Sequence, residues 1–414
     1  MTTTHGSSVD LLAHRSVEVL AQLRESGQLK VLQTIEGPMD ATVRLKRPGG
    51  GSAEVACFCS NNYLGLANHP EVREAGIEGI RTYGAGTASV RFICGSFEPH
   101  ERLEETLARF LGVEAAYSFV SCWTAAEALF PTLCEPGDLI IADELNHACL
   151  IDGMRLCAAI KKGVRRKVYP HSDLGALRRV LEGAESDPDV TGARWVVTDG
   201  VFSMEGDIAK LAELRELADE FGAILVVDDS HGTGVMGATG RGTHEHCGLG
   251  GDQIDFFAGT LGKALGGGAG GFLAGSRSGI DLVVQRGRPT LFSNALPVTI
   301  ACSANKAIEI LMREPQRVEK LRANVAYARA GFREAGLDVL ESPTAICPII
   351  VGDTARAIAM SNRLLEMGVF VIGFGYPVVP EGTARLRAQI SAAHEKEHLD
   401  LLIGSLKKLK EEGT

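Results

Sequence analysis

The sequence contains no Cys-x-x-Cys spacing, although it holds 10 cysteines. The closest pair is Cys57 and Cys59, and most of the others lie in apolar segments. Cysteines at short, regular spacings are typical of zinc sites and of small disulfide frameworks. The pattern here predicts buried, reduced thiols instead. The run His-Glu-His-Cys at residues 244–247 is the densest group of possible ligands, but no second ligand pair lies nearby. We therefore predict no metal site.

Long apolar runs and an excess of positive charge are also absent. No segment is long and apolar enough to span a bilayer, and the amino terminus lacks the pattern of a signal peptide. The formal net charge is −10, and no basic stripe is present that could neutralise nucleic-acid phosphates. We expect a cytoplasmic protein that binds neither a membrane nor nucleic acid.

The chain has the composition and length of a large globular protein. Its 414 residues are 45% hydrophobic and 23% charged, which allows one large domain and a smaller one. Short apolar segments separated by helical patterns predict an α/β fold with a mostly parallel sheet. We predict an N-terminal arm over residues 1–58, a large domain over 59–300 and a small C-terminal α/β domain over 301–414. Residues 9–25 of the arm have the spacing of an amphipathic helix, which we expect to pack on another part of the molecule or on a second subunit.

Two segments between residues 224 and 271 carry the strongest chemical signal. Residues 224–227 form an unbroken apolar run, typical of a strand buried on both faces, and this run ends in Asp228. A second apolar stretch at residues 256–258 leads into a glycine-rich loop that contains Lys263. Open α/β sheets bind ligands at the carboxyl ends of their strands. An acid and a lysine at two such ends suit pyridoxal phosphate, which needs a lysine for its Schiff base and a carboxylate facing its pyridine nitrogen.

A phosphate-binding P-loop is the alternative for a glycine followed by a lysine. That motif requires Gly-x-x-x-x-Gly-Lys-Ser/Thr. Here Phe257 occupies the first glycine position and Ala264 follows the lysine. The P-loop therefore fails twice, and the pyridoxal site is favoured.

Asp-Asp-Ser-His at residues 228–231 and Thr-Leu-Gly-Lys at residues 260–263 resemble the cofactor motifs of the α-oxoamine synthases. Members of that family join an amino acid to an acyl-CoA on pyridoxal phosphate. The resemblance covers residues 59–400 and is densest to the glycine C-acetyltransferase (2-amino-3-ketobutyrate CoA ligase) branch. It implies a fold type I PLP-dependent transferase, pyridoxal 5'-phosphate (PLP) as the cofactor, and a homodimer with shared active sites.

The resemblance also implies roles for individual residues. Lys263 would form the Schiff base and act as the general base, Asp228 would face the pyridine nitrogen, and His231 would bind the ring oxygen. His147 would stack on the cofactor ring, and Ser203 would lie near the phenolic oxygen. The implied catalytic residues are Lys263, His147 and Asp228.

The phosphate of the cofactor would lie where a strand turns into a helix after residue 120. A helix N-terminus presents free backbone amides and the positive end of the helix dipole. By resemblance, the amides of Cys122 and Trp123 hold the phosphate, and Ser293 and Asn294 reach the phosphate of the neighbouring subunit's cofactor. The complete set of implied cofactor residues is Ser121, Cys122, Trp123, His147, Ser203, Asp228, His231, Thr260, Lys263, Ser293 and Asn294.

The substrates follow from two further positions of the family pattern. Asn61 matches the residue that contacts the amino acid, and Arg387 matches the arginine whose planar fork can hold a carboxylate bidentately. We expect glycine and acetyl-CoA, which would give 2-amino-3-ketobutyrate and CoA reversibly. Trp123 and Ala126 stand where the family usually has Phe and Asn. These departures leave open another acyl thioester or amino acid, as in 8-amino-7-oxononanoate synthase. An aminotransferase, which would share Asp228 and Lys263, is the remaining alternative.

Overall fold

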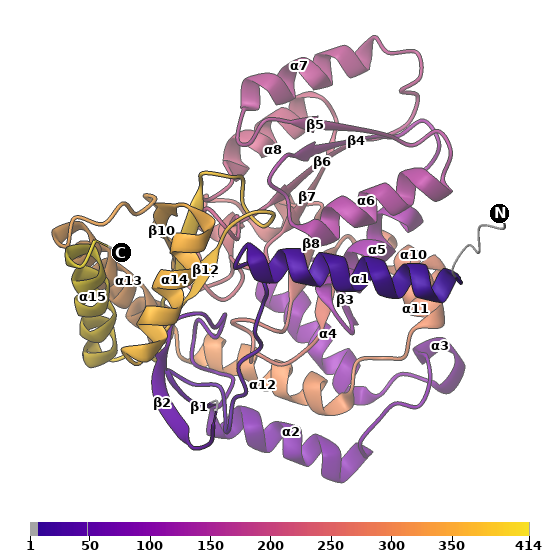
Figure 1. The fold of residues 1–414 in the computed structure, drawn as a ribbon. Coiled ribbons are helices and arrows are strands. Elements are labelled where there is room, and N and C mark those ends of the chain that lie inside the picture. The colour runs from indigo at the N-terminus through magenta and orange to yellow at the C-terminus, as the bar shows by residue number, and fades with distance from the viewer. Residues whose placement is uncertain (1–6, 48, 414) are drawn as a thin grey trace.

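The computed structural model of the protein describes residues 7–47 and 49–413. Residues 1–6 and 48 of the predicted arm, and residue 414 of the predicted small domain, lie outside the described residues. Strands and helices alternate along most of the chain (Figure 1). The strands are β1 (Thr42–Lys46), β2 (Ser52–Cys57), β3 (Ala115–Phe119), β4 (Leu139–Asp143), β5 (Arg165–Tyr169), β6 (Arg194–Asp199), β7 (Ile224–Asp228), β8 (Phe256–Thr260), β9 (Gly271–Gly275), β10 (Ile346–Gly352), β11 (Val369–Phe370), β12 (Ile372–Phe374) and β13 (Ala384–Gln389). The helices are α1 (Ser8–Glu25), α2 (Pro70–Tyr83), α3 (Arg91–Cys94), α4 (Glu98–Leu111), α5 (Cys122–Leu133), α6 (Ala148–Ile160), α7 (Leu174–Glu185), α8 (Leu211–Glu220), α9 (Thr243–His246), η1 (Gly251–Gln253), α10 (Arg277–Arg286), α11 (Arg288–Phe292), α12 (Val298–Arg313), α13 (Gln316–Glu334), α14 (Thr354–Glu366) and α15 (Lys396–Glu411).

A seven-stranded sheet forms the centre of the molecule, in the order β3-β9-β8-β7-β6-β4-β5. The strands from β8 to β5 pair in parallel, whereas β9 pairs antiparallel with both of its neighbours. Every residue of β3, β4 and β9 is buried, as expected for strands of a sheet that helices cover on both faces. The predicted α/β fold with a mostly parallel sheet is confirmed.

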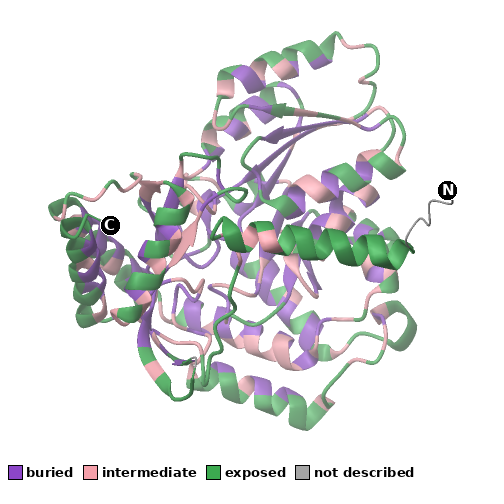
Figure 2. Cartoon of the chain, viewed as in Figure 1, coloured by how far each residue is buried: buried purple, intermediate pink, exposed green. Residues whose placement is uncertain are grey.

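The two faces of this sheet pack against different helices. In β7, Leu225 and Val227 belong to one apolar core and Val226 belongs to another, because successive side chains of a strand point to opposite faces. Helices α5, α6 and α10 contribute to the core around Val226, and α4, α7 and α8 contribute to the other. Figure 2 shows the buried strands in the centre with the partly exposed helices around them. Because the strands from β8 to β5 are parallel, their carboxyl ends meet at one edge of the sheet.

The two ends of the chain meet in a second, smaller sheet. Strand β11, near the C-terminus, pairs in parallel with β2 of the predicted arm, and β2 pairs antiparallel with β1. A further antiparallel sheet has the order β10-β13-β12. In Figure 1, β1 and β2 lie beside this C-terminal part of the molecule. Residues from both ends therefore contribute to one region, although the division at residues 58 and 300 stays a prediction.

Helix α1 confirms the predicted helix in the arm and leaves its apolar side chains exposed. Ser7 caps the helix, because its side chain accepts a hydrogen bond from the backbone N–H of Asp10 at 3.2 Å. None of the residues in α1 is buried, and Val9 and Val17 are among its exposed apolar residues. The helix is correspondingly mostly green in Figure 2. Its packing on a second subunit stays a prediction.

No helix among the described residues has the length and apolar character that crossing a membrane requires.

Candidate active site

A cavity of about 170 Å³ lies at the carboxyl ends of β6, β7 and β8, where the helices α5 and α6 begin. Most of the predicted cofactor residues line it, namely Cys122, Trp123, His147, Asp228, His231, Thr260 and Lys263. The predicted residues Ser121, Ser203, Ser293 and Asn294 are not among the described residues that line it. Cys149, Asp199, Val201 and Ser230 complete the lining, and the sequence analysis did not assign them to the site.

Asp228 ends β7 and offers one nearly free carboxylate oxygen to the cavity. Its Oδ1 accepts a hydrogen bond from the backbone N–H of Ser230 at 2.9 Å. Its Oδ2 faces the thiols of Cys122 and Cys149 at 3.8 and 3.6 Å. Thiols are weak donors, so Oδ2 keeps its capacity to accept a strong N–H bond. A protonated pyridine nitrogen is such a donor, and the carboxylate therefore fits the predicted cofactor.

The same three residues form a possible metal-binding group. The two sulfur atoms and a carboxylate oxygen of Cys122, Cys149 and Asp228 all lie within 4.8 Å of one another. Two sulfurs and an oxygen are ligands that zinc accepts. Because all three residues line the cavity in which the cofactor fits, we assign them to the cofactor site, and the absence of a metal stays a prediction.

Lys263, which also lines the cavity, begins a series of hydrogen bonds that leads away to Asn61. Its Nζ lies 2.8 Å from Nε2 of His231, and Nδ1 of His231 lies 2.8 Å from the hydroxyl of Tyr63. The Tyr63 hydroxyl in turn donates to Oδ1 of Asn61 at 3.3 Å. The structure thus connects the predicted lysine, the predicted histidine and the predicted substrate residue through Tyr63, which the sequence analysis did not single out.

The surroundings of Lys263 and His231 favour the neutral forms of both side chains. Burial lowers the pKa of Lys263 and outweighs the opposing negative charge of Asp228, and the positive charge of Arg387 adds to the lowering. Burial and the neighbouring Lys263 charge lower the pKa of His231 well below its usual value. A neutral His231 that accepts from Lys263 at Nε2 carries its proton on Nδ1 and donates it to Tyr63. Lys263 therefore reaches the neutral form, which can take up a proton, more readily than an ordinary lysine.

Asp199 is a buried acid that ends β6, next to Asp228 across the sheet. Its Oδ1 accepts a hydrogen bond from the backbone N–H of His147 at 3.0 Å, and this bond fixes the loop before α6. Burial and the Asp228 charge raise the pKa of Asp199 well above its usual value. The strand-end argument that selected Asp228 applies equally to Asp199, so a signal for this residue was present in the sequence.

His147 and Cys149 sit together at the start of α6. The side chain of His147 caps this helix, because Nδ1 accepts from the backbone N–H of Cys149 at 3.2 Å. Its ring also lies 6.5 Å from the ring of Trp123 in an edge-on arrangement. His147 is thus held from two sides at the cavity. Its stacking on the cofactor stays a prediction.

The first turn of α5 has the features of a phosphate site. Ser121 caps the helix, and its hydroxyl oxygen accepts from the backbone N–H of Thr124 at 3.1 Å. The amides of Cys122 and Trp123 belong to the first turn, whose N–H groups have no carbonyl partner within the helix. Ser121 therefore shapes the turn instead of lining the cavity, and the two amides remain candidates for the phosphate.

The two departures from the family pattern differ in position. Trp123 is 39% exposed and lines the cavity, and its Nε1 donates to Glu127 at 3.1 Å. Ala126 is fully buried within the core formed with α6, where its backbone lies against Gly153. Only the first departure therefore alters the wall of the cavity.

Arg387 lies on β13 and is buried. Its Nη1 donates to the backbone carbonyl of Ser203 at 2.7 Å, and its guanidinium lies 5.1 Å from the ring centroid of Phe374. Its Nε is buried and has no hydrogen-bond partner among the described residues. Buried polar groups in proteins are nearly always hydrogen-bonded. An unpaired N–H on a buried guanidinium therefore points to a missing acceptor such as a carboxylate.

Ser293 and Asn294 follow α11, and Asn294 is exposed. The single chain places neither in the lining of the cavity described above. Their predicted contact with a neighbouring subunit's cofactor stays a prediction.

The arrangement defines a class of enzyme. A strand-end carboxylate, a partly buried lysine in the loop after the next strand and a helix N-terminus converge on one cavity at the edge of a mostly parallel sheet. This is the site of a fold type I PLP-dependent transferase, and the cofactor is pyridoxal phosphate.

Comparisons with known proteins name the family. Residues 53–406 match the model of the aminotransferase class I and II family. The chain is 43% identical over 383 residues to the mitochondrial 2-amino-3-ketobutyrate coenzyme A ligase of Bos taurus, across 92% of this chain and 88% of that protein. It is also 43% identical over 395 residues to the 8-amino-7-oxononanoate synthase of Symbiobacterium thermophilum, across 95% of this chain and 96% of that protein.

Comparison with a solved structure shows that the fold is shared. A serine palmitoyltransferase from S. paucimobilis with bound PLP and myriocin superposes with a TM-score of 0.87 at 28% identity, over 96% of this chain and 97% of that chain. The chain belongs to the class I and II aminotransferase family and, within it, to the α-oxoamine synthases. It is a PLP-dependent acyltransferase, and the predicted resemblance is confirmed.

Proposed function

We propose that the enzyme condenses glycine with acetyl-CoA, giving 2-amino-3-ketobutyrate and CoA, and that the reaction is reversible. The observation that carries the amino-acid half is the unpaired Nε of Arg387, which is buried and suited to a substrate carboxylate. The acyl half is supported by the similarity to 2-amino-3-ketobutyrate coenzyme A ligases, at 43% identity for the bovine protein.

Each of four residues has its own role in the proposed reaction. Arg387 binds the carboxylate of glycine, and Asn61 contacts the amino acid. Lys263, whose pKa burial lowers, removes a proton from the α-carbon as general base. Asp228 holds a negative charge where the pyridine nitrogen binds, and so keeps that nitrogen protonated. When bound, pyridoxal phosphate supplies the electron sink that makes the α-proton removable. The α-carbon then attacks the thioester carbon of the acyl donor, and the CoA thiolate leaves.

The assignments around this reaction are part of the proposal. His231 binds the ring oxygen of the cofactor, His147 stacks on its ring, and Ser203 and Thr260 lie near it. We further infer a homodimer in which Ser293 and Asn294 reach the partner subunit's cofactor, a cytoplasmic location, and the division at residues 58 and 300. The exposed apolar side chains of α1 support the dimer, because exposed apolar helix faces mark association sites.

Replacement of Arg387 by alanine is expected to weaken glycine binding. Loss of a charge-assisted hydrogen bond removes about 1.5–3 kcal/mol, or about ten- to a hundredfold in affinity. The cofactor should remain bound, because Arg387 does not line its cavity among the described residues. Titration of the holoenzyme with glycine, followed through the absorbance of the cofactor, measures the effect. An unchanged titration would move the carboxylate site elsewhere.

A second candidate function is the use of a longer acyl thioester, as in 8-amino-7-oxononanoate synthase. The 43% identity to the Symbiobacterium thermophilum synthase supports it, and Trp123 gives the cavity a wall that differs from the family pattern. An aminotransferase, by contrast, would transfer the amino group to a keto acid and release no CoA.

A panel of acyl thioesters separates these candidates. Glycine, alanine and serine are each combined with acyl-CoA donors of increasing chain length and with a carrier-bound donor, and CoA or carrier release is followed. We expect glycine with acetyl-CoA to have the highest kcat/KM. A donor that exceeds acetyl-CoA by about tenfold or more, which is 1.4 kcal/mol of transition-state binding, would contradict the acetyl assignment and leave the family activity intact.

A further inference from the structure

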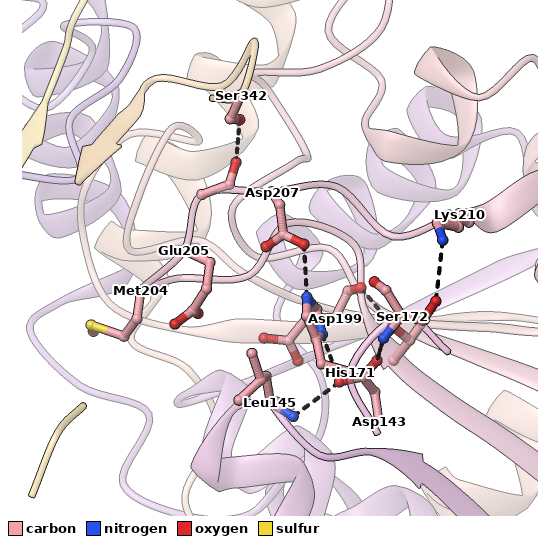
Figure 3. Close-up of polar contacts among 12 residues, drawn as sticks. Asp143, Leu145, His171, Ser172, Asp199, Met204, Glu205, Asp207, Lys210 and Ser342 are labelled. Carbon is pink, nitrogen blue, oxygen red and sulfur yellow. Dashed lines mark hydrogen bonds and ion pairs between the residues drawn. The ribbon is translucent and has the colours of Figure 1, made fainter. Parts of the chain in front are cut away.

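A short hairpin at the edge of the large sheet also contacts the C-terminal sheet. It follows β6, and Val201 and Ile208 pair as an antiparallel bridge. The backbone N–H of Phe202 donates to the carbonyl of Asp207 at 3.0 Å, and that of Gly206 donates to the carbonyl of Phe202 at 2.8 Å. We call residues 201–208 the β6 hairpin. Figure 3 draws its tip from Met204 to Asp207, with Ser342 on one side and His171 on the other.

The C-terminal part holds one side of the β6 hairpin. Arg387 donates to the carbonyl of Ser203 at 2.7 Å, and Arg385 donates to the carbonyl of Met204 at 3.0 Å. The hydroxyl of Thr344 donates to the carbonyl of Gly206 at 2.6 Å, and Ser342 donates to the same oxygen. The orientation of Arg387 therefore depends on where the hairpin carbonyls lie.

His171, which follows β5, holds the other side. Its Nε2 lies 2.8 Å from Oδ2 of Asp207, and its Nδ1 lies 2.9 Å from Oδ1 of Asp143 at the end of β4. Its ring also meets that of Phe202 edge-on at 4.4 Å. Figure 3 shows the imidazole between the two carboxylates. His171 thus joins the hairpin to the carboxyl edge of the large sheet.

The His171 imidazole in this bridge is positively charged, and Asp143, which anchors it to the large sheet, is held in place by further hydrogen bonds. Burial lowers the pKa of His171, but hydrogen bonds to Asp143 and Asp207 outweigh it and raise the pKa to about 10. Both ring nitrogens therefore carry protons and donate at neutral pH. Asp143 is itself fixed, because its side chain accepts from the backbone N–H groups of Leu145 and Ser172, both at 2.9 Å.

We propose that His171 is a positioning residue for the substrate carboxylate. Its bridge from Asp143 to Asp207 holds the β6 hairpin where the Ser203 carbonyl orients the guanidinium of Arg387, with Nε free for the amino acid. The proposal rests on the proposed function, in which Arg387 binds glycine. His171 is not among the described residues that line the cavity, so it would act only through the hairpin.

The first test variant removes the Asp207 carboxylate, which is the end of the bridge on the hairpin, and leaves the contact between His171 and Asp143. Asp207→Ala keeps the His171–Asp143 pair and the backbone of the hairpin, and its side chain is 35% exposed, so the fold tolerates the change. His171→Phe is the second variant, because it keeps an aromatic edge against Phe202. The matched control is Asp187→Ala, which loses an ion pair with Arg165 on β5 away from the hairpin.

Glycine is titrated into each holoenzyme through the cofactor absorbance, and KM and kcat are measured. We expect Asp207→Ala and His171→Phe to weaken glycine binding by about two- to thirtyfold, the range for residues that act through a packed network. The KM for the acyl donor should stay unchanged, and Asp187→Ala should behave as the unmodified enzyme. A general loss of structure would instead alter both substrates and the melting temperature together.

A double-mutant cycle decides whether the effect passes through Arg387. In the Arg387→Ala background, Asp207→Ala should cause no further loss of glycine affinity, because the residue it orients is gone. Unchanged glycine binding in Asp207→Ala, or the same fold-loss in both backgrounds, would overturn the proposal. Unchanged binding in Arg387→Ala alone would instead overturn the carboxylate assignment on which it rests.

Discussion

Replacement of Lys263 by alanine is expected to lower kcat by about 10²- to 10⁴-fold, the contribution of a well-positioned general acid or base. The Nζ of Lys263 lies 2.8 Å from His231 and lines the cavity with Asp228. No other lysine is among the described residues that line this cavity, so no neighbouring amine can take its place. Added ethylamine should restore part of the rate, because a free amine can occupy the space of the lost side chain.

Chemical labelling tests the same residue independently. Borohydride reduction of the unmodified holoenzyme should fix the cofactor on Lys263, and peptide mass mapping should locate the label there. Lys161 is a suitable control, because it is also partly buried and hydrogen-bonded but lies on the far end of α6. Lys161→Ala should keep the label and the rate. A label on any other lysine of the cofactor-saturated protein contradicts the assignment.

The Asp228→Asn variant is expected to lose about 10²- to 10³-fold in kcat, the usual effect of removing one preorganised electrostatic partner from an active site. The amide keeps the shape and the hydrogen bond from Ser230 but carries no charge to hold the pyridine nitrogen protonated. The cofactor should still bind, because its phosphate and its lysine contacts remain.

Asp229→Asn provides a matched control one residue away. Asp229 is fully buried and points elsewhere, since its oxygens accept from the hydroxyls of Thr233 and Thr243. Burial raises its pKa to about 7, so a neutral amide costs less at this position than at an ordinary aspartate. Its kcat should stay close to that of the unmodified enzyme. Equal losses in the two variants, or a full rate in Asp228→Asn, would contradict the role of Asp228.

Much of the site could be predicted because its signals are local. An apolar run of four residues that stops at an acid locates a strand end, and the same reasoning placed Lys263 beyond β8. The parallel order of the strands then brings these two ends to one edge, as the structure has them. Asp199 also ends a strand, but a strand-end acid is equally an ordinary turn residue, so this signal alone does not select it.

Other members of the site have no local signal. Tyr63 contacts His231 across 168 positions of sequence, and Arg387 contacts Ser203 across 184. Cys149 reaches Asp228 only because α6 begins beside the end of β7. Such contacts depend on how helices and sheets pack, and a residue's own neighbours in the sequence do not encode that packing. His171 likewise looks like a loop histidine until Asp143 and Asp207 are seen on its two sides.

The sequence by itself therefore determined the fold class, the strand ends that carry Asp228 and Lys263, and the cofactor that such a pair suits. It did so because burial on both faces of a parallel strand leaves an unmistakable apolar run with polar ends. Only the tertiary structure decided that β11 joins β2, that Ala126 is packing while Trp123 faces the cavity, and that the β6 hairpin links His171 to Arg387. The physical reason is that these features are side-chain contacts between elements distant in sequence, which exist only once the layers have packed.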